Sequence, residues 1–126
     1  MEYSFNTFEN LIKICEEEHK TIYEVMQEKE AYDFEITVNA VREKVQKNIS
    51  AMKEAILHGL ISKEKSYSGL CGDDCAKLNE KYKNKSALFG TVFENITRYA
   101  LATMEENLRM NKIVACPTAG SCGIVP

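Results

Sequence analysis

Two long stretches of the chain carry apolar residues at every third or fourth position, and this spacing restricts the fold more than any other feature. In the first stretch these residues are Val38, Val41, Val45, Ile49, Met52 and Ile56. In the second they are Leu88, Val92, Phe93, Ile96, Ala100, Met104 and Leu108. A period near 3.6 places such residues on one face of an α-helix. We therefore predict two long amphipathic helices, over about 38–59 and 86–110, each with this face toward the core.

Two glycines are placed to shape these helices. Gly59 follows the first apolar stripe, and we predict that it ends the helix in a left-handed conformation, which costs glycine little. Gly90 lies inside the second stripe, where glycine costs roughly 1 kcal/mol relative to alanine. We therefore interpret Gly90 as the mark of a close approach between helices.

Three shorter helices are predicted from their capping residues. Asn6 is the predicted N-cap of the first, and Thr21 with Glu24 fits a capping box that opens the second. The apolar positions are Phe8, Leu11, Ile12 and Cys15 in the first helix and Ile22, Val25 and Met26 in the second. A third helix is predicted over 73–82, where two initial aspartates suit the helix dipole.

The helical pattern stops at Lys112. Ile113 to Ala115 is β-prone and precedes a loop of small residues, so an extended tail is predicted there. The predicted fold class is all-α: an irregular helical bundle with an extended C-terminal tail. A length of 126 residues suits one domain. Because a domain seldom ends on a glycine loop that enters an apolar run, we expect residues 1–126 to be a truncated part of a larger domain.

Composition and charge exclude several classes of protein. The net charge is -3 with dispersed lysines, which gives no electrostatic footprint for nucleic acid. The sequence has no apolar run long enough to span a bilayer and no signal-peptide pattern at its start, so we expect neither a membrane nor secretion. Five cysteines are an odd number and unevenly spaced, which argues against a disulfide framework. A cytoplasmic protein with free thiols is the prediction.

The cysteines and histidines give a weak metal signal. Cys71 and Cys75 form C-x3-C, and Cys116 and Cys122 form C-x5-C, but neither has the tight C-x2-C spacing of a zinc knuckle. We interpret all four as thiols without a metal, and Cys15 as a core residue. The two histidines are His19 and His58. Neither has a partner carboxylate or cysteine in a recognisable sequence pattern, so both are interpreted as surface residues or residues at helix ends.

The small-residue loop of the tail is the best functional candidate. Thr118, Ala119 and Gly120 would let backbone N–H groups approach an anionic ligand closely, and the threonine hydroxyl could add a hydrogen bond. The alternative, a tight turn needed only for packing, stays open. No glycine-rich phosphate loop, Ser-His-Asp arrangement or pair of catalytic carboxylates stands out.

Two segments resemble a known enzyme family. Residues 111–126 read NKIVACPTAGSCGIVP, and residues 68–78 read SGLCGDDCAKL. Both resemble the alpha chain of iron–sulfur-dependent L-serine dehydratases, which has helices of similar length at matching places. The family usually has threonine and alanine where this chain has Cys71 and Cys75. Some of its branches have asparagine at the position of Ala119.

The resemblance implies a chemistry for the parent enzyme. Such enzymes convert L-serine to pyruvate and ammonia with a 4Fe–4S cluster that three cysteines hold, leaving one iron open as a Lewis acid. The equivalent of residues 118–120 contacts the serine carboxylate region. The cluster cysteines lie downstream of Pro126, so no catalytic residue and no metal ligand is expected in this N-terminal part of the catalytic alpha-chain domain. A beta part, as a separate chain or fused domain, is the implied partner.

The residues themselves leave two other functions open. The chain could be a stand-alone helical interaction or dimerisation module, or a small cysteine-rich metal-binding protein. We expect residues 1–126 alone to be inactive and to bind no cluster. We also expect self-association, because helices that pack against a missing remainder would expose an apolar patch.

Overall fold

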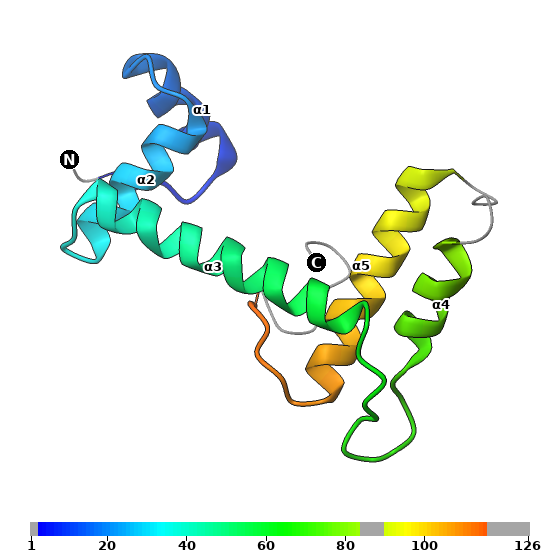
Figure 1. The fold of residues 1–126 in the computed structure, drawn as a ribbon. Coiled ribbons are helices and arrows are strands. Elements are labelled where there is room, and N and C mark those ends of the chain that lie inside the picture. The colour runs from blue at the N-terminus through cyan, green and yellow to red at the C-terminus, as the bar shows by residue number, and fades with distance from the viewer. Residues whose placement is uncertain (1–2, 84–89, 116–126) are drawn as a thin grey trace. The chain divides into compact units, whose positions relative to one another are not determined.

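The computed structural model describes residues 3–83 and 90–115, and all the regular structure in that part of the chain is helical. The elements are α1 (Phe8–Glu17), α2 (Ile22–Asp33), α3 (Val38–Gly59), α4 (Asp74–Lys83) and α5 (Thr91–Leu108). The all-α prediction is confirmed, as Figure 1 shows. The chain divides into two compact units, Met1–Lys47 and Asn48–Pro126, and the boundary falls within α3. None of the described helices is both long and apolar enough to cross a membrane.

The first unit is built on the packing of α1 against α2. Its core is formed by Tyr3, Leu11 and Val25, and Cys15 is partly buried against them. The hydroxyl of Thr7 accepts a hydrogen bond from the Asn10 backbone and caps α1, so the predicted cap was one residue too early.

The capping box of α2 is confirmed. The Thr21 hydroxyl accepts from the Glu24 backbone N–H, and the Glu24 carboxylate accepts from the Thr21 backbone N–H. These two hydrogen bonds satisfy donors that the first turn of a helix otherwise leaves free.

In the second unit, α4 packs against α5, and the end of α3 crosses α5 (Figure 1). A Cβ atom on Gly59 would lie 2.5 Å from the carbonyl oxygen of Ala102, so only glycine fits at this crossing. The left-handed conformation predicted for Gly59 is wrong: positive φ values occur at Gly69, Gly72 and Gly90. The helix does end at Gly59, as predicted. Gly90 precedes α5 with a φ of 87° and has open space around it, so the close approach predicted at Gly90 is wrong.

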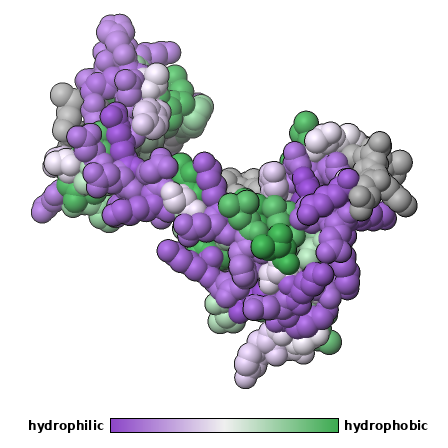
Figure 2. Space-filling model, in the orientation of Figure 1, coloured by the Kyte–Doolittle hydropathy of each residue, from purple (hydrophilic) through white to green (hydrophobic). Residues whose placement is uncertain are grey.

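The predicted apolar face of α3 is only partly buried. Val41 is buried, but Val45 is 49% exposed and Ile49 is 38% exposed. Further along the helix the buried positions are three small residues, Ala51, Ala55 and Gly59. Figure 2 shows hydrophobic surface over the C-terminal turns of this helix, where Leu57 is 65% exposed. The spacing therefore predicted the helix but not which of its residues are covered.

Substitution of Gly59 tests the close crossing with α5. Alanine is the better helix former by about 1 kcal/mol, yet its Cβ would meet the Ala102 backbone. We expect Gly59→Ala to lower the free energy of unfolding by about 1–3 kcal/mol in denaturant titrations. Ser50→Ala, at an exposed position of the same helix, is the matched control and should be neutral or slightly stabilising. A Gly59→Ala protein as stable as the wild type would contradict the packing role.

Candidate functional site

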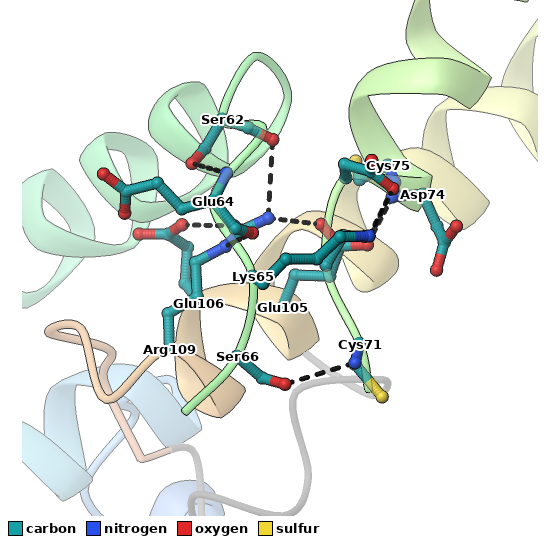
Figure 3. Close-up of polar contacts among 12 residues, drawn as sticks. Ser62, Glu64, Lys65, Ser66, Cys71, Asp74, Cys75, Glu105, Glu106 and Arg109 are labelled. Carbon is teal, nitrogen blue, oxygen red and sulfur yellow. Dashed lines mark hydrogen bonds and ion pairs between the residues drawn. The ribbon is translucent and has the colours of Figure 1, made fainter. Parts of the chain in front are cut away.

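A buried guanidinium lies at the end of α5, directly before the tail. The Arg109 side chain is 2% exposed, and its Nη2 and Nη1 atoms lie 2.7 Å from Glu105 Oε2 and 2.8 Å from Glu106 Oε1. Its Nε donates to the carbonyl of Glu64 at 2.8 Å, and Nη2 also donates to the carbonyl of Ser62. Figure 3 shows Arg109 between the two carboxylates and the loop that follows α3. We call Glu105, Glu106 and Arg109 the ionic cluster.

Glu105 joins the cluster to α4. Its Oε1 atom accepts hydrogen bonds from the backbone N–H groups of Asp74 and Cys75 at 3.0 and 3.1 Å (Figure 3). These are donors of the first turn of α4, where the helix dipole favours a negative charge. The side chain of Glu105 thus caps a helix that begins 31 residues earlier in the sequence.

Glu106 joins the cluster to α3 and to the start of the tail. Its Oε2 atom lies 2.8 Å from Nδ1 of His58 and accepts from the amide of Asn111 at 3.1 Å. The Glu106 carboxylate also accepts from Arg109, so it acts as an ionised acceptor, and the His58 proton belongs on Nδ1. In the neutral ring Nε2 is then the basic nitrogen. His58 has a partner carboxylate after all, which the sequence pattern did not predict because 48 residues separate the two.

A shallow hollow of about 290 Å³ lies beside this histidine. The residues that line it are Ala51, Glu54, Ala55, His58, Glu106, Asn111 and Lys112. It therefore combines a basic ring nitrogen, one exposed carboxylate and one exposed ammonium group at the point where the chain leaves α5 for the tail. Such a set can bind a small polar molecule.

The residues that the sequence favoured for binding lie outside the described part of the chain. These are Thr118, Ala119 and Gly120. Cys116 and Cys122, interpreted as thiols without a metal, also lie outside it. The structure describes the tail as far as Ala115, without regular secondary structure from Asn111 onward. The ionic cluster fixes the base of this tail.

The described cysteines do not form the ligand set of a metal cluster. Cys15, Cys71 and Cys75 are free thiols, and no group of three potential ligands occurs among the residues that the structure covers. Cys75 is fully buried, and its Sγ donates to the carbonyl of Arg98 at 3.4 Å. Burial, with a smaller contribution from the charge of Glu105, raises the pKa of the Cys75 thiol to about 11. A thiol in this state is a poor cluster ligand, because thiolates are the ligands.

The ionic cluster was missed in the sequence. Glu105, Glu106 and Arg109 lie at the i, i+3 and i+4 spacings that pair side chains on a helix. That spacing would have predicted a surface ion pair. Nothing local in the sequence indicated that the pair is buried or that it reaches α3, α4 and Asn111.

The fold and the site define an all-helical protein in which buried charges hold the base of a small-residue tail. The serine dehydratase alpha chain family matches residues 17–126. The chain therefore belongs to this family, as the resemblance of residues 68–78 and 111–126 predicted.

Individual relatives agree. A probable L-serine dehydratase alpha chain from Bacillus subtilis is 34% identical over 122 residues, which is 97% of this chain and 40% of that protein. An L-serine dehydratase alpha chain from Peptoniphilus asaccharolyticus is 31% identical, covering 96% of this chain and 41% of that protein. An L-serine dehydratase from Helicobacter pylori is 28% identical over 98% of this chain and 28% of its own length. No solved structure matches significantly.

Replacing Arg109 should unfold the second unit more readily. Arg109→Met leaves two buried carboxylates without their cation, and breaking such a pair costs about 3–5 kcal/mol. Thermal and denaturant unfolding measure the loss. Lys81→Met, a change of the same charge at an exposed position of α4, should cost less than about 1 kcal/mol. Adding Glu106→Gln to Arg109→Met should recover part of the lost free energy of unfolding. If the effects of the two substitutions on this free energy were strictly additive, they would contradict a coupled cluster.

Alkylation should separate the two cysteines of the C-x3-C pair. A pKa near 11 leaves about one Cys75 thiol in a thousand ionised at pH 8, and the side chain is buried, whereas Cys71 is exposed. We expect iodoacetamide to label Cys75 at least about 100-fold more slowly than Cys71 in the native protein, as followed by peptide mass spectrometry. In urea the two rates should converge. Equal rates in the native protein would place Cys75 at the surface.

Proposed function

We propose that this chain is part of the alpha chain of an enzyme that deaminates L-serine to pyruvate and ammonia. The observation that carries the proposal is the family match over residues 17–126, together with relatives named L-serine dehydratase along nearly the whole chain. The chain spans about two fifths of the length of the first two relatives, so the activity is proposed for the full-length enzyme.

The role of this chain in that enzyme is to present the substrate-binding tail. The ionic cluster anchors Asn111 through Glu106, and the described tail then runs to Ala115, three residues before Thr118. In our proposal the backbone N–H groups of residues 118–120 and the Thr118 hydroxyl bind the serine carboxylate. A hydrogen bond to a charged group contributes about 1.5–3 kcal/mol, which is enough to orient a small substrate.

The cofactor and partner belong to the full-length enzyme in the same proposal. Cysteines elsewhere in it would hold a 4Fe–4S cluster, because the described thiols of this chain do not fit that role. A beta part, fused or separate, would complete the enzyme. We also propose a cytoplasmic location, which suits the free thiols of Cys15, Cys71 and Cys75.

A chimeric alpha chain tests the function. This chain replaces the matching segment of the Bacillus subtilis relative, and the product is combined with the beta part and reconstituted anaerobically with iron and sulfide. We expect pyruvate to form in proportion to added L-serine. The 126-residue chain treated in the same way should form none, since its described cysteines provide no cluster site. A folded chimera without serine-dependent pyruvate would contradict the proposal.

A substitution in the tail tests the binding role. In the chimera, Thr118→Val should lower kcat/KM for L-serine at least about tenfold, through the lost hydrogen bond to the carboxylate. Thr97→Val is the matched control: Thr97 lies on α5, where its hydroxyl donates to the carbonyl of Phe93. It should leave kcat/KM nearly unchanged. If both changes had equal effects, a substrate contact by Thr118 would be excluded.

A further inference from the structure

The exposed side of α5 is apolar along its whole length. The exposed large residues on this helix are Val92 at 75%, Phe93 at 54%, Ile96 at 56%, Met104 at 43% and Leu108 at 40%. Four of them, with the half-buried Ala100, follow a spacing of four residues from 92 to 108. A helix of 18 residues is about 27 Å long, so this row forms a continuous ridge of that order. We call it the α5 ridge.

The charged residues of α5 face the other way. Glu94, Glu105 and Glu106 are buried, and Arg98 is half-buried with hydrogen bonds to Asn79 and Asn95. Thr91 is the remaining exposed residue of this helix and carries no charge. A helix on the surface of a soluble domain normally shows the opposite pattern, with its charges outward.

A helix with inward charges and outward apolar residues has the pattern of a helix that packs on both sides. The C-terminal part of the charged side of α5 is already engaged within the second unit, since Glu105 caps α4 and Glu106 contacts His58 and Asn111. The large residues of the ridge keep 40% to 75% of their surface exposed. Contiguous exposed apolar surface of this kind marks a site where another polypeptide packs.

We propose that the α5 ridge is the docking surface for the part of the serine dehydratase alpha chain that lies outside the matched segment. This inference rests on the proposed function. The chain matches 40% of the Bacillus subtilis relative, so about 60% of that alpha chain remains to be packed. A segment in the same polypeptide meets the ridge at an effective concentration in the millimolar range, which favours it over a second copy.

The chemistry of the occupant follows from the ridge. With no charge among its exposed residues, the ridge offers nothing that would pair with an ionic partner. Rows at a spacing of four residues fit into the grooves of a facing helix. The partner surface is therefore an apolar face of one or more helices of the same alpha chain.

Cysteine labelling at the ridge tests the docking. Ile96→Cys is placed in the 126-residue chain and in the full-length chimera, and its alkylation rate is followed by peptide mass spectrometry. In dilute solution, the shorter chain should label rapidly, because residue 96 is 56% exposed. In the chimera, we expect labelling at least tenfold slower. Equal rates in the two proteins would overturn the proposal.

Two controls sharpen the result. Tyr67→Cys, on a loop of the same unit, checks that the reagent reaches an exposed site in the shorter chain, because Tyr67 is 99% exposed. The shorter chain carrying Ile96→Cys is also labelled over a range of concentrations, with sedimentation in parallel. Self-association through the ridge should appear at high concentration. Self-association of the shorter chain at nanomolar concentration could also slow the labelling of residue 96. If that labelling were as slow as in the chimera, a second copy would be the occupant and the proposal would be wrong.

A second measurement does not depend on folding of the chimera. The unmatched part of the Bacillus subtilis alpha chain, produced as a separate polypeptide, is mixed with the 126-residue chain. We expect the separate polypeptide to protect the Ile96→Cys variant from alkylation. We also expect the double variant with Ile96→Lys and Met104→Lys to bind that polypeptide about 30-fold more weakly or worse. Tyr67→Lys with Leu70→Lys is the control of equal charge. Binding that survives the ridge substitutions would overturn the proposal.

These readouts separate the docking from the proposed function. Labelling reports burial of residue 96 and needs no catalysis. A protected ridge in a chimera that does not deaminate serine would support the docking and contradict the function. An active chimera with an unprotected ridge would support the function and overturn the docking.

Discussion

The second unit depends on one buried contact, the pairing of Arg109 with Glu105 and Glu106. Two carboxylates next to each other on a helix would repel each other and could not be buried without a cation. The guanidinium pairs with both, which offsets one of the two negative charges, and it also donates to carbonyls of the loop after α3. Each carboxylate then has a free oxygen lone pair to bind another element: α4 through Glu105, and His58 with Asn111 through Glu106.

This arrangement explains why α5 is charged inside and apolar outside. The polar bonds that α5 makes inward require charged residues on its buried side, while the crossing with α3 requires small residues at Gly59 and Ala102. The large apolar residues are left on the opposite side, on the α5 ridge. The relatives are about two and a half times as long as the segment that they share with this chain.

The position of the cluster links the fold to the family. It lies between the segments that resemble the serine dehydratase alpha chain, contacting Asp74 and Cys75 of one and Asn111 of the other. The two segments are more than 30 residues apart in sequence, and adjacent residues of α5, Glu105 and Glu106, form hydrogen bonds with both.

The sequence by itself determined the helices, the capping box at Thr21 and the family. The hydrogen bonds of a helix and its cap, and the motif of residues 111–126, each depend on residues that are close together in the sequence. It did not determine which helix faces are buried, what Gly59 and Gly90 do, or that His58 meets Glu106. Periodicity shows that a face is apolar, not what covers it. Only the tertiary structure decided these points, since burial of a charge depends on a partner that lies far away in the sequence.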